Sequence, residues 1–316
     1  MCFRSIPGKR ASGTAPGAAD DLSVGELHSA NGSMIVAVDC HAHVMRRDAP
    51  LAPDRHSAPK RDCTVEEYLA VLDAHGISHG VLTAPSFYAT DNSLLLDALD
   101  RAVGRLRGTV IVAPDVGRAA LAAIGERGAV GIRLNWFRRA SLPDVTSTDY
   151  RRLFATVRDL GWHVEIYLEG PSLANVLPRI RDSGANVVVD HFGSPDPARG
   201  VACPGFQRVL EGMRAGDTWV KLSASYRQGG VDCQRYVDAL LDAGGPRQLV
   251  WASDWPFVSH EDHVRYEDCL NDLHNWVPNA ATRSIILAET PAKLFGFTQA
   301  VDREPPGPNS FGRGVT

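Results

Sequence analysis

The stretch Met34-Ile-Val-Ala-Val-Asp-Cys-His-Ala-His43 places two histidines directly after an apolar run. A run of this kind predicts a buried strand, here over Ile35–Val38. Side chains two residues apart on a strand point to the same face, so His41 and His43 should project together, with Asp39 on their side. Two convergent imidazoles form either a pair of metal ligands or a pair that transfers protons.

The same arrangement of an apolar run followed by polar residues recurs later in the chain. Val187-Val-Val-Asp-His191 ends in a histidine, and Leu249-Val-Trp-Ala-Ser-Asp-Trp-Pro256 carries Asp254 after its apolar part. Apolar segments of strand length are found at Ile35–Val38, Gly80–Ala84, Thr109–Ala113, Val130–Leu134, His163–Leu168, Val187–Asp190, Trp219–Leu222 and Leu249–Ala252.

Amphipathic segments with a helical period separate these strands. They are Val65–His75, Asn92–Leu106, Arg118–Arg127, Thr148–Leu160, Leu173–Ser183, Phe206–Ala215, Gln234–Ala243 and His263–Trp276. Strands that alternate with helices predict a parallel sheet. Eight such units favour a (β/α)8 TIM barrel of the α/β class, a fold that commonly takes about 250 residues. The alternative is an open doubly wound sheet, which would call for a glycine-rich phosphate loop after the first strand, and the sequence has none there.

The two ends of the chain differ in composition from the middle. Residues 1–33 are rich in Gly, Ala, Ser and Asp and predict a disordered leader without a secretory signal. Residues 298–316 contain Pro305-Pro-Gly-Pro308 and predict a disordered tail. One barrel domain should therefore occupy residues 34–297.

Composition and charge exclude several classes of function. The net charge of −4 gives no basic field for nucleic acid or a membrane surface, and no apolar stretch reaches the ~20 residues that cross a bilayer. The six cysteines are scattered without C-x-x-C spacing, which favours reduced thiols and a cytoplasmic location. The expected partner is a small molecule, and the oligomeric state stays open.

Polar side chains follow most of the predicted strands, and in a barrel the carboxyl ends of the strands meet at one mouth. A single histidine at such a position is more often a core residue than a ligand. The whole set is harder to explain as core: His41, His43, Ser86, Tyr88, Arg133, Tyr167, His191, Arg227 and Asp254.

His41-x-His43, His191 and Asp254 resemble the signature of the amidohydrolase superfamily. Further segments resemble 2-pyrone-4,6-dicarboxylate lactonase and related lactonases: Pro85-Ser-Phe-Tyr-Ala-Thr-Asp-Asn92, Gly131-Ile-Arg-Leu-Asn135, Asp190-His-Phe-Gly193, Lys221-Leu-Ser223 and Ser253-Asp-Trp-Pro256. The resemblance covers residues 34–297. It implies a barrel hydrolase that opens the lactone of a small dicarboxylate in the catabolism of aromatic compounds.

The resemblance also bears on metal. Metal-dependent amidohydrolases carry a histidine at the end of strand five, where this chain has Tyr167, and His163 lies at the start of that strand, away from the mouth. Tyr167 matches the metal-independent lactonases, so we expect no required cofactor. The alternative is a divalent metal such as zinc on His41, His43, His191 and Asp254.

Roles follow from residue type and from the resemblance. Asp254 is expected to be the general base for water, and His41, His43 and His191 to polarise the carbonyl. Arg133, Arg139 and Arg227 match carboxylate-binding arginines of the family, and guanidinium forks suit carboxylates. A buried unpaired Arg133 would be costly, which argues for an anionic partner, whereas Arg139 also fits a solvated loop.

Weaker contacts to the substrate are expected from Ser86, Tyr88 and Tyr167. Other functions stay open beside the dicarboxylate lactonase. They are a sugar-acid or sulfomuconate lactonase, a metal-dependent decarboxylase of the same superfamily, and a catalytically silent binder of small acids.

Overall fold

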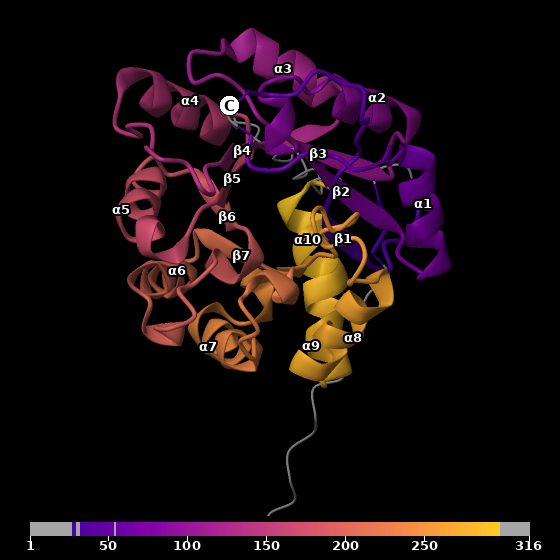
Figure 1. Cartoon of the computed structure of the whole chain (residues 1–316), viewed down its shortest axis with the longest axis vertical. Helices are drawn as coiled ribbons and strands as arrows, with labels where there is room; N and C mark the ends of the chain where they lie inside the picture. Colours follow the sequence, from indigo (N-terminus) through magenta and orange to yellow (C-terminus); the bar gives the residue numbers. More distant parts are fainter. Residues whose placement is uncertain (1–26, 30–31, 54, 298–316) are drawn as a thin grey trace, which may run out of the picture.

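Eight parallel strands form a nearly closed barrel in the computed structural model, which describes residues 27–29, 32–53 and 55–297. Each strand pairs with the next along the chain. Figure 1 shows the barrel with the helices arranged around it. The strands are β1 (Val38–Ala42), β2 (His79–Thr83), β3 (Leu106–Val110), β4 (Ala129–Asn135), β5 (His163–Tyr167), β6 (Asn186–Val189), β7 (Thr218–Leu222) and β8 (Leu249–Trp251).

The barrel closes between β1 and the segment after β8. The amide of Asp254 donates to the carbonyl of His41 (2.9 Å), and the amide of His43 donates to the carbonyl of Trp255 (2.9 Å). Asp39 strengthens this junction, because its carboxylate accepts from the Ser253 amide (2.9 Å) and hydroxyl (2.6 Å). The closure therefore brings the histidines of the first strand next to Asp254.

The helices cover the outside of the sheet (Figure 1). They are α1 (Val65–Ala74), α2 (Ser93–Arg101), α3 (Arg118–Glu126), α4 (Thr148–Asp159), α5 (Gly170–Arg181), α6 (Pro204–Ala215), α7 (Gln234–Gly244), α8 (Tyr266–Trp276), α9 (Ala280–Ser284) and α10 (Thr290–Leu294). Thr64 caps α1 through its hydroxyl, and Gly216 ends α6 in the left-handed conformation that glycine tolerates. No helix within the described ranges is long and apolar enough to cross a membrane.

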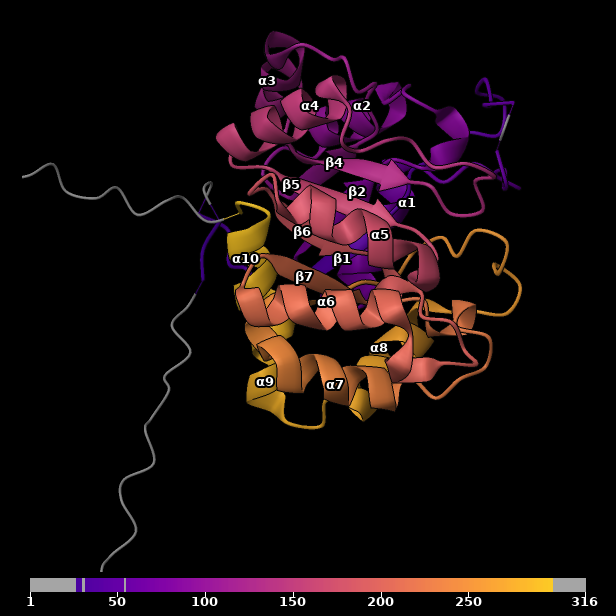
Figure 2. The ribbon, with the colours of Figure 1, turned by 90° about the vertical axis from the view of Figure 1, so that its left-hand side faces the viewer.

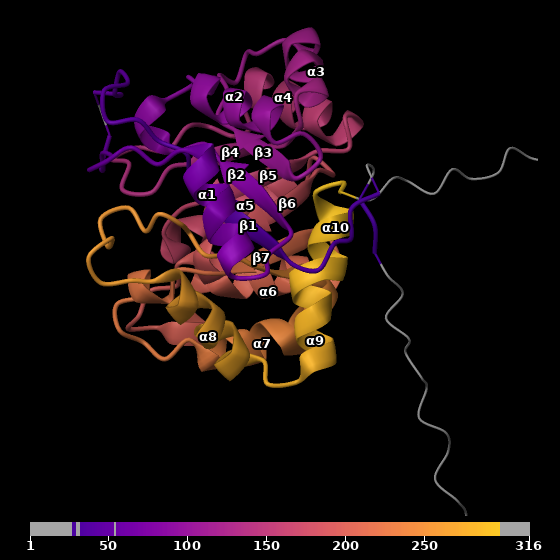
Figure 3. The same ribbon diagram turned by 90° about the vertical axis from the view of Figure 1, so that its right-hand side faces the viewer.

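The last helices lie at the amino end of the barrel. Figures 2 and 3 show α10 on the side opposite the long loops that follow the strands. Ala292 and Phe295 pack there against Val38, Val81 and Val250 in an apolar cluster. The amino end is thus filled by side chains, and the carboxyl end is left for the site.

Most predicted elements are found within a few residues, and three differ. The first strand is Val38–Ala42 rather than Ile35–Val38, and the third is Leu106–Val110 rather than Thr109–Ala113. The second helix ends at Arg101, since Gly104 with a φ of 82° turns the chain into β3. Pairing with neighbours sets these limits, and β1 continues through buried polar residues that break an apolar pattern.

Helices α9 and α10 and the π-helical turn between them (Ile285–Glu289) were not predicted. The expected leader and tail fall mainly outside the described residues. Within the expected leader, the Ile35 amide donates to the Leu27 carbonyl and His28 pairs with Met34, so residues just before 34 contact the start of the domain.

Candidate active site

A cavity of about 380 Å³ opens among the loops that follow the strands. Both polar and aromatic side chains line it: His43, His56, Ser57, Pro85, Ser86, Phe87, Arg133, Asn135, Phe137, Arg138, Tyr167, His191, Tyr226, Arg227, Gly229, Asp254, Val258, Ser259 and His260. These residues come from loops and strand ends all around the barrel. The cavity therefore occupies the mouth, where this fold places its reactive groups.

Three imidazoles face one carboxylate oxygen at the floor of this mouth. The Oδ1 atom of Asp254 lies 3.6 Å from Nε2 of His41, 3.7 Å from Nε2 of His43 and 3.9 Å from Nε2 of His191. The Nε2 atoms of His41 and His43 are 3.3 Å apart. All four side chains are buried, with His41 fully so. The four groups thus enclose a small polar centre.

Asp254 is held through its other oxygen. The Tyr226 hydroxyl donates to Oδ2 at 2.7 Å, and Nε of Arg227 donates to the same atom at 2.8 Å. Burial alone would raise the pKa of Asp254, but Arg227 and the histidines outweigh it and hold that pKa well below its usual value. Asp254 is therefore ionised, with Oδ1 turned toward the histidines.

The backbone at this mouth is unusual. His191, Ala224 and Asp254 have φ values of 50°, 53° and 64°, in the left-handed region that residues other than glycine seldom adopt. Such conformations cost free energy and gather at functional sites. Here they turn the ends of β6, β7 and β8 so that His191 and Asp254 face the same centre.

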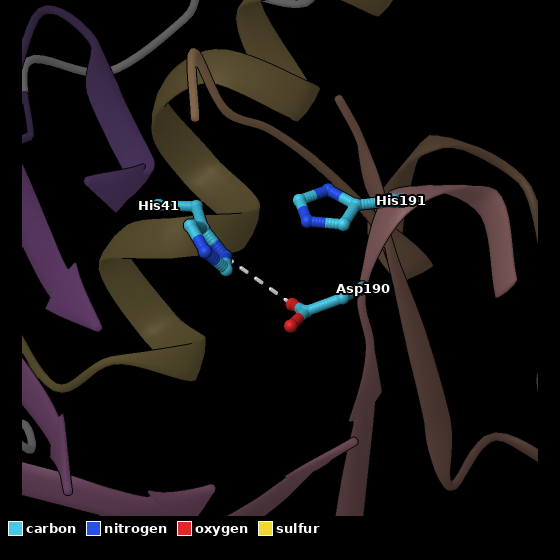
Figure 4. Close-up of side chains that lie close together, drawn as sticks. All are labelled: His41, Asp190 and His191. Atoms are coloured by element: carbon cyan, nitrogen blue, oxygen red, sulfur yellow. Dashed lines mark ion pairs between the residues drawn. The ribbon is translucent and has the colours of Figure 1, made fainter. Parts of the chain in front are cut away.

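A group of buried charges lies beneath the histidines, formed by Arg133, Glu165, Asp190 and Lys221, and we call it the charge quartet. Nζ of Lys221 is 2.6 Å from Glu165 and 3.1 Å from Asp190, while Arg133 is 3.1 Å from Glu165 and 3.0 Å from Asp190. Figure 4 shows His41 directed at Asp190, with His191 above. Two cations and two anions in contact allow these charges to remain buried.

The two carboxylates of the charge quartet differ. Burial raises the pKa of Asp190, but Lys221, His41 and Arg133 outweigh burial and hold it well below its usual value. Burial and the nearby Asp190 raise the pKa of Glu165 to about 7 against the opposing effect of the two cations. Burial likewise lowers the pKa of His191 to about 4, so this imidazole is neutral at neutral pH.

The side chains of this centre include donor atoms that could hold a metal. Tetrahedral zinc holds ligand atoms ~2.0–2.3 Å away, which places them ~3.3–3.7 Å from one another. His41, His43 and Asp254 match that spacing, and His41, Asp190 and His191 form a second possible group. The charge around His41 does not match, because Nη2 of Arg133 is 3.4 Å from its Nε2 and Nζ of Lys221 is 2.9 Å from its Nδ1. The donor spacing thus allows a metal, and the neighbouring cations oppose it.

The structure gathers most of the predicted site residues at one cavity. His43, Ser86, Arg133, Tyr167, His191, Arg227 and Asp254 line it. His41 lies just beneath the surface of the cavity, within the same polar centre. His163 is at the start of β5 beside Phe295, away from the mouth as expected.

Four expectations need correction. Tyr88 donates its hydroxyl to the Arg46 carbonyl (2.6 Å) and does not line the cavity. Arg139 lies in an adjoining pocket, while its neighbour Arg138 faces the cavity. Buried Arg133 already pairs with Glu165 and Asp190, so its burial does not require an anionic ligand, although it also lines the cavity.

The fourth correction concerns Asp39, which does not share the side of the histidines. Its carboxylate meets Ser253 and the Tyr266 hydroxyl. The register of β1 against β2 is irregular between Asp39 and Ala42, and this breaks the simple alternation of sides.

Sequence reasoning missed Glu165, Lys221 and Tyr226 as members of the site. The signal for the first two was a charged residue inside an apolar strand, in His163-Val-Glu-Ile-Tyr167 and Trp219-Val-Lys-Leu222. Charged residues are rarely fully buried unless they are paired. A charged residue in either strand therefore predicts a buried partner of opposite charge. Glu165 and Lys221 are such partners for each other.

The comparisons with known proteins agree with this geometry. The chain is 29% identical to the 4-sulfomuconolactone hydrolase of Hydrogenophaga intermedia, across 82% of this chain and 88% of that one. It is 28% identical to the 2-pyrone-4,6-dicarboxylate hydrolase of Comamonas testosteroni, across 82% and 90%. Among solved structures, a probable 2-pyrone-4,6-dicarboxylic acid hydrolase of Acinetobacter baumannii with citric acid bound superposes with a TM-score of 0.79. It is 31% identical and covers 83% of this chain and 100% of that one.

The match to a family is extensive. Residues 38–297, which span the barrel from the first strand to the end of the described chain, match the family described as amidohydrolase. The chain therefore belongs to the amidohydrolase family.

Proposed function

We propose that this protein is a lactonase that opens the cyclic ester of a small, planar dicarboxylate such as 2-pyrone-4,6-dicarboxylate. The observation that carries the proposal is the ionised Asp254, whose Oδ1 faces three imidazoles in a cavity that also holds Arg227 and Arg138. Two relatives whose names specify a pyrone dicarboxylate and a sulfonated muconolactone support the same reaction class.

The chemistry follows from the residue types. Oδ1 of Asp254 accepts a proton from water as the water oxygen attacks the lactone carbonyl. His41, His43 and His191 surround the carbonyl oxygen and stabilise the tetrahedral oxyanion through hydrogen bonding. The ring C–O bond then breaks, and the proton held by Asp254 passes to the departing oxygen. Atoms and charge balance without a further reactant.

The walls of the cavity suit a flat anionic ring. The rings of Phe137 and Tyr167 are stacked with centroids 4.5 Å apart and planes 7° apart, and both line the cavity. Arg227 and Arg138 supply guanidinium groups for carboxylates, and Ser86 adds a hydroxyl. Arg139 lines the adjoining pocket with Arg138, where a second carboxylate would meet it.

We infer that no metal is required, because two buried cations already lie against His41 and the polarising groups are in place without one. A location in the cytoplasm is part of the proposal. The cysteines within the described residues are free and buried, as reduced thiols would be: Cys40, Cys63, Cys203, Cys233 and Cys269.

The test is a substrate panel with purified protein. It compares kcat/KM for 2-pyrone-4,6-dicarboxylate, 4-sulfomuconolactone and a neutral aldonolactone. We expect the pyrone dicarboxylate to be the best substrate and the neutral lactone the poorest. A higher kcat/KM for 4-sulfomuconolactone would move the assignment to that reaction, and a preference for the aldonolactone would replace it with a sugar-acid lactonase. Decarboxylation of an aromatic acid without lactone hydrolysis would overturn it.

A further inference from the structure

Phe137 lies where three cavities meet. It lines the catalytic cavity, and it also lines two side cavities of about 400 Å³ and 310 Å³. Within the described part of the chain, no other residue lines all three of these cavities. The phenyl ring of Phe137 is therefore their common wall.

The two side cavities differ in their chemistry. The larger one carries three arginines: Arg55, Arg138 and Arg139. The smaller one is bounded by three prolines: Pro171, Pro195 and Pro197. Tyr167 lines both the smaller side cavity and the catalytic cavity. A flat ligand that extended past Phe137 along Tyr167 would thus meet apolar walls on the side of the prolines.

The ring of Phe137 is held by its neighbours although the residue is only half-buried. It stacks on Tyr167 with centroids 4.5 Å apart and planes 7° apart, and the His56 ring meets it nearly at a right angle, with centroids 5.8 Å apart. The guanidinium carbon of Arg138 lies over the ring, 5.2 Å from its centroid. Stacked, edge-to-face and cation–ring contacts are all favourable, so together they fix the direction of the ring.

The backbone on either side of Phe137 is anchored to the end of β5. The amide of Trp136 donates to the Tyr167 carbonyl (3.0 Å), and the amide of Arg138 donates to the Glu169 carboxylate (2.8 Å). The Trp136 side chain is itself buried. Phe137 is therefore a fixed wall built into the loop after β4, and its ring covers one face of Tyr167.

We propose that Phe137 is a specificity-determining residue that confines the ligands of the catalytic cavity to acids with a single ring. A second ring fused to the ligand and stacked on Tyr167 would need the place that the phenyl ring occupies, and such a clash is an ordinary source of specificity. The inference rests on the proposed function in one respect, namely that the ligand is a planar dicarboxylate. It does not require that the ligand be hydrolysed.

Truncation of Phe137 should open the cavity without moving the loop. In Phe137→Ala both backbone anchors remain, because they involve the amides of Trp136 and Arg138. The face of Tyr167 is then uncovered, and the catalytic cavity joins the two side cavities. An aromatic ligand can fill the apolar space that a large-to-small substitution leaves. We therefore expect the variant to accept a fused second ring stacked on Tyr167.

The measurement is calorimetric binding of two acids that cannot be hydrolysed, isophthalate and naphthalene-1,3-dicarboxylate. Both carry the same pair of carboxylates on a flat ring, and they differ by one fused ring. In the wild type, Kd for the naphthalene acid should exceed Kd for isophthalate by at least ~10-fold. In Phe137→Ala the ratio of the two Kd values should fall by ~10- to 200-fold, the usual range for a small change of size in an apolar pocket.

Two further variants serve as controls. Phe137→Tyr keeps the aromatic ring and should keep the wild-type ratio of Kd values. Phe137→Leu removes the ring but leaves a bulky apolar side chain, so the ratio should shift in the same direction as in Phe137→Ala, by a smaller factor. In Phe137→Ala, the naphthalene acid should also displace isophthalate, because both occupy the catalytic cavity.

Several results would overturn the inference. They are an unchanged ratio in both Phe137→Ala and Phe137→Leu, a ratio in Phe137→Tyr that shifts as far as in Phe137→Ala, a naphthalene acid that does not displace isophthalate, and no binding of either acid by any of the proteins. Hydrolysis of a lactone is measured separately. An active lactonase whose Phe137→Ala variant still rejects the second ring contradicts this inference alone, and an inactive protein that shows the expected ratios contradicts the proposed function alone.

Discussion

The two ends of the barrel each bury a histidine from a strand, and they use it differently. At the amino end, His163 of β5 is 1% exposed, with Nε2 3.3 Å from the Thr109 hydroxyl and its ring against Phe295. At the carboxyl end, His41 of β1 is 0% exposed and lies among Lys221, Arg133 and Asp190. Burial is the largest cause of a lowered pKa at both. Burial therefore does not distinguish a histidine of the site from a histidine of the core. The charged side chains in contact with His41 do.

The largest effect is expected from removing the general base at the carboxyl end of the barrel. Asp254→Asn keeps the shape of the side chain and removes its ability to accept a proton. We expect kcat to fall by about 10²-fold or more, the usual scale of general acid–base catalysis. Steady-state kinetics on the best lactone measures this, with His163→Leu as the control at the amino end. Turnover close to that of the wild type would remove Asp254 from the mechanism.

A second change tests substrate charge at the same end. Arg227→Met removes a guanidinium that contacts both Asp254 and the cavity. A charge-assisted hydrogen bond is worth roughly 1.5–3 kcal/mol, so kcat/KM for a dicarboxylate lactone should fall by about 10- to 150-fold more than that for a neutral lactone. The ratio between substrates isolates the carboxylate contact, because the altered environment of Asp254 affects both. Equal losses would contradict a role for Arg227 in binding a carboxylate.

The amino end gives a prediction about stability and acid. Burial lowers the pKa of His163 to about 3, so its folded state is neutral while the unfolded chain binds a proton near pH 6.5. The contribution of His163 to the free energy of unfolding is fully present above pH 6.5 and is lost as the pH falls toward 3. Between pH 6.5 and 4.5 the loss is about 2–3 kcal/mol. His163→Leu should therefore lose less stability over that range.

Urea unfolding at pH 7 and pH 4.5 provides the measurement. At pH 7 the variant should lose only about 1 kcal/mol, the worth of one hydrogen bond, and should keep its kcat. Other buried histidines such as His191 contribute with the same sign, so both proteins weaken in acid. An identical loss in the two proteins would show that His163 is not neutral and buried in the way described.

The same contrast explains what the sequence could predict. Apolar runs and helical periods located the strands and helices, because burial on both faces of a parallel sheet leaves that pattern. His43, His191 and Asp254 were found because chemically capable residues stand where such strands end. The first strand was misplaced because Asp39 and His41 are polar and yet fully buried within it.

What the sequence could not predict depends on partners far apart in the chain. Lys221 and Glu165 look anomalous alone, and only the barrel brings their side chains to 2.6 Å. Arg138 has a φ of 60° and lines the cavity, whereas Arg139 does not. No sequence motif indicated this local turn of the backbone. Charge pairing and loop conformation thus set the details that composition and periodicity leave open.

We propose that the protein's own imidazoles, carboxylate and buried cations open an anionic lactone without a metal. The most direct test is kcat/KM for 2-pyrone-4,6-dicarboxylate before and after exhaustive chelation, with the metal content of the protein measured in both states. We expect protein free of divalent metal to hydrolyse the lactone at an unchanged rate. Stoichiometric zinc in the active protein, with activity lost on its removal and regained on its return, would contradict it.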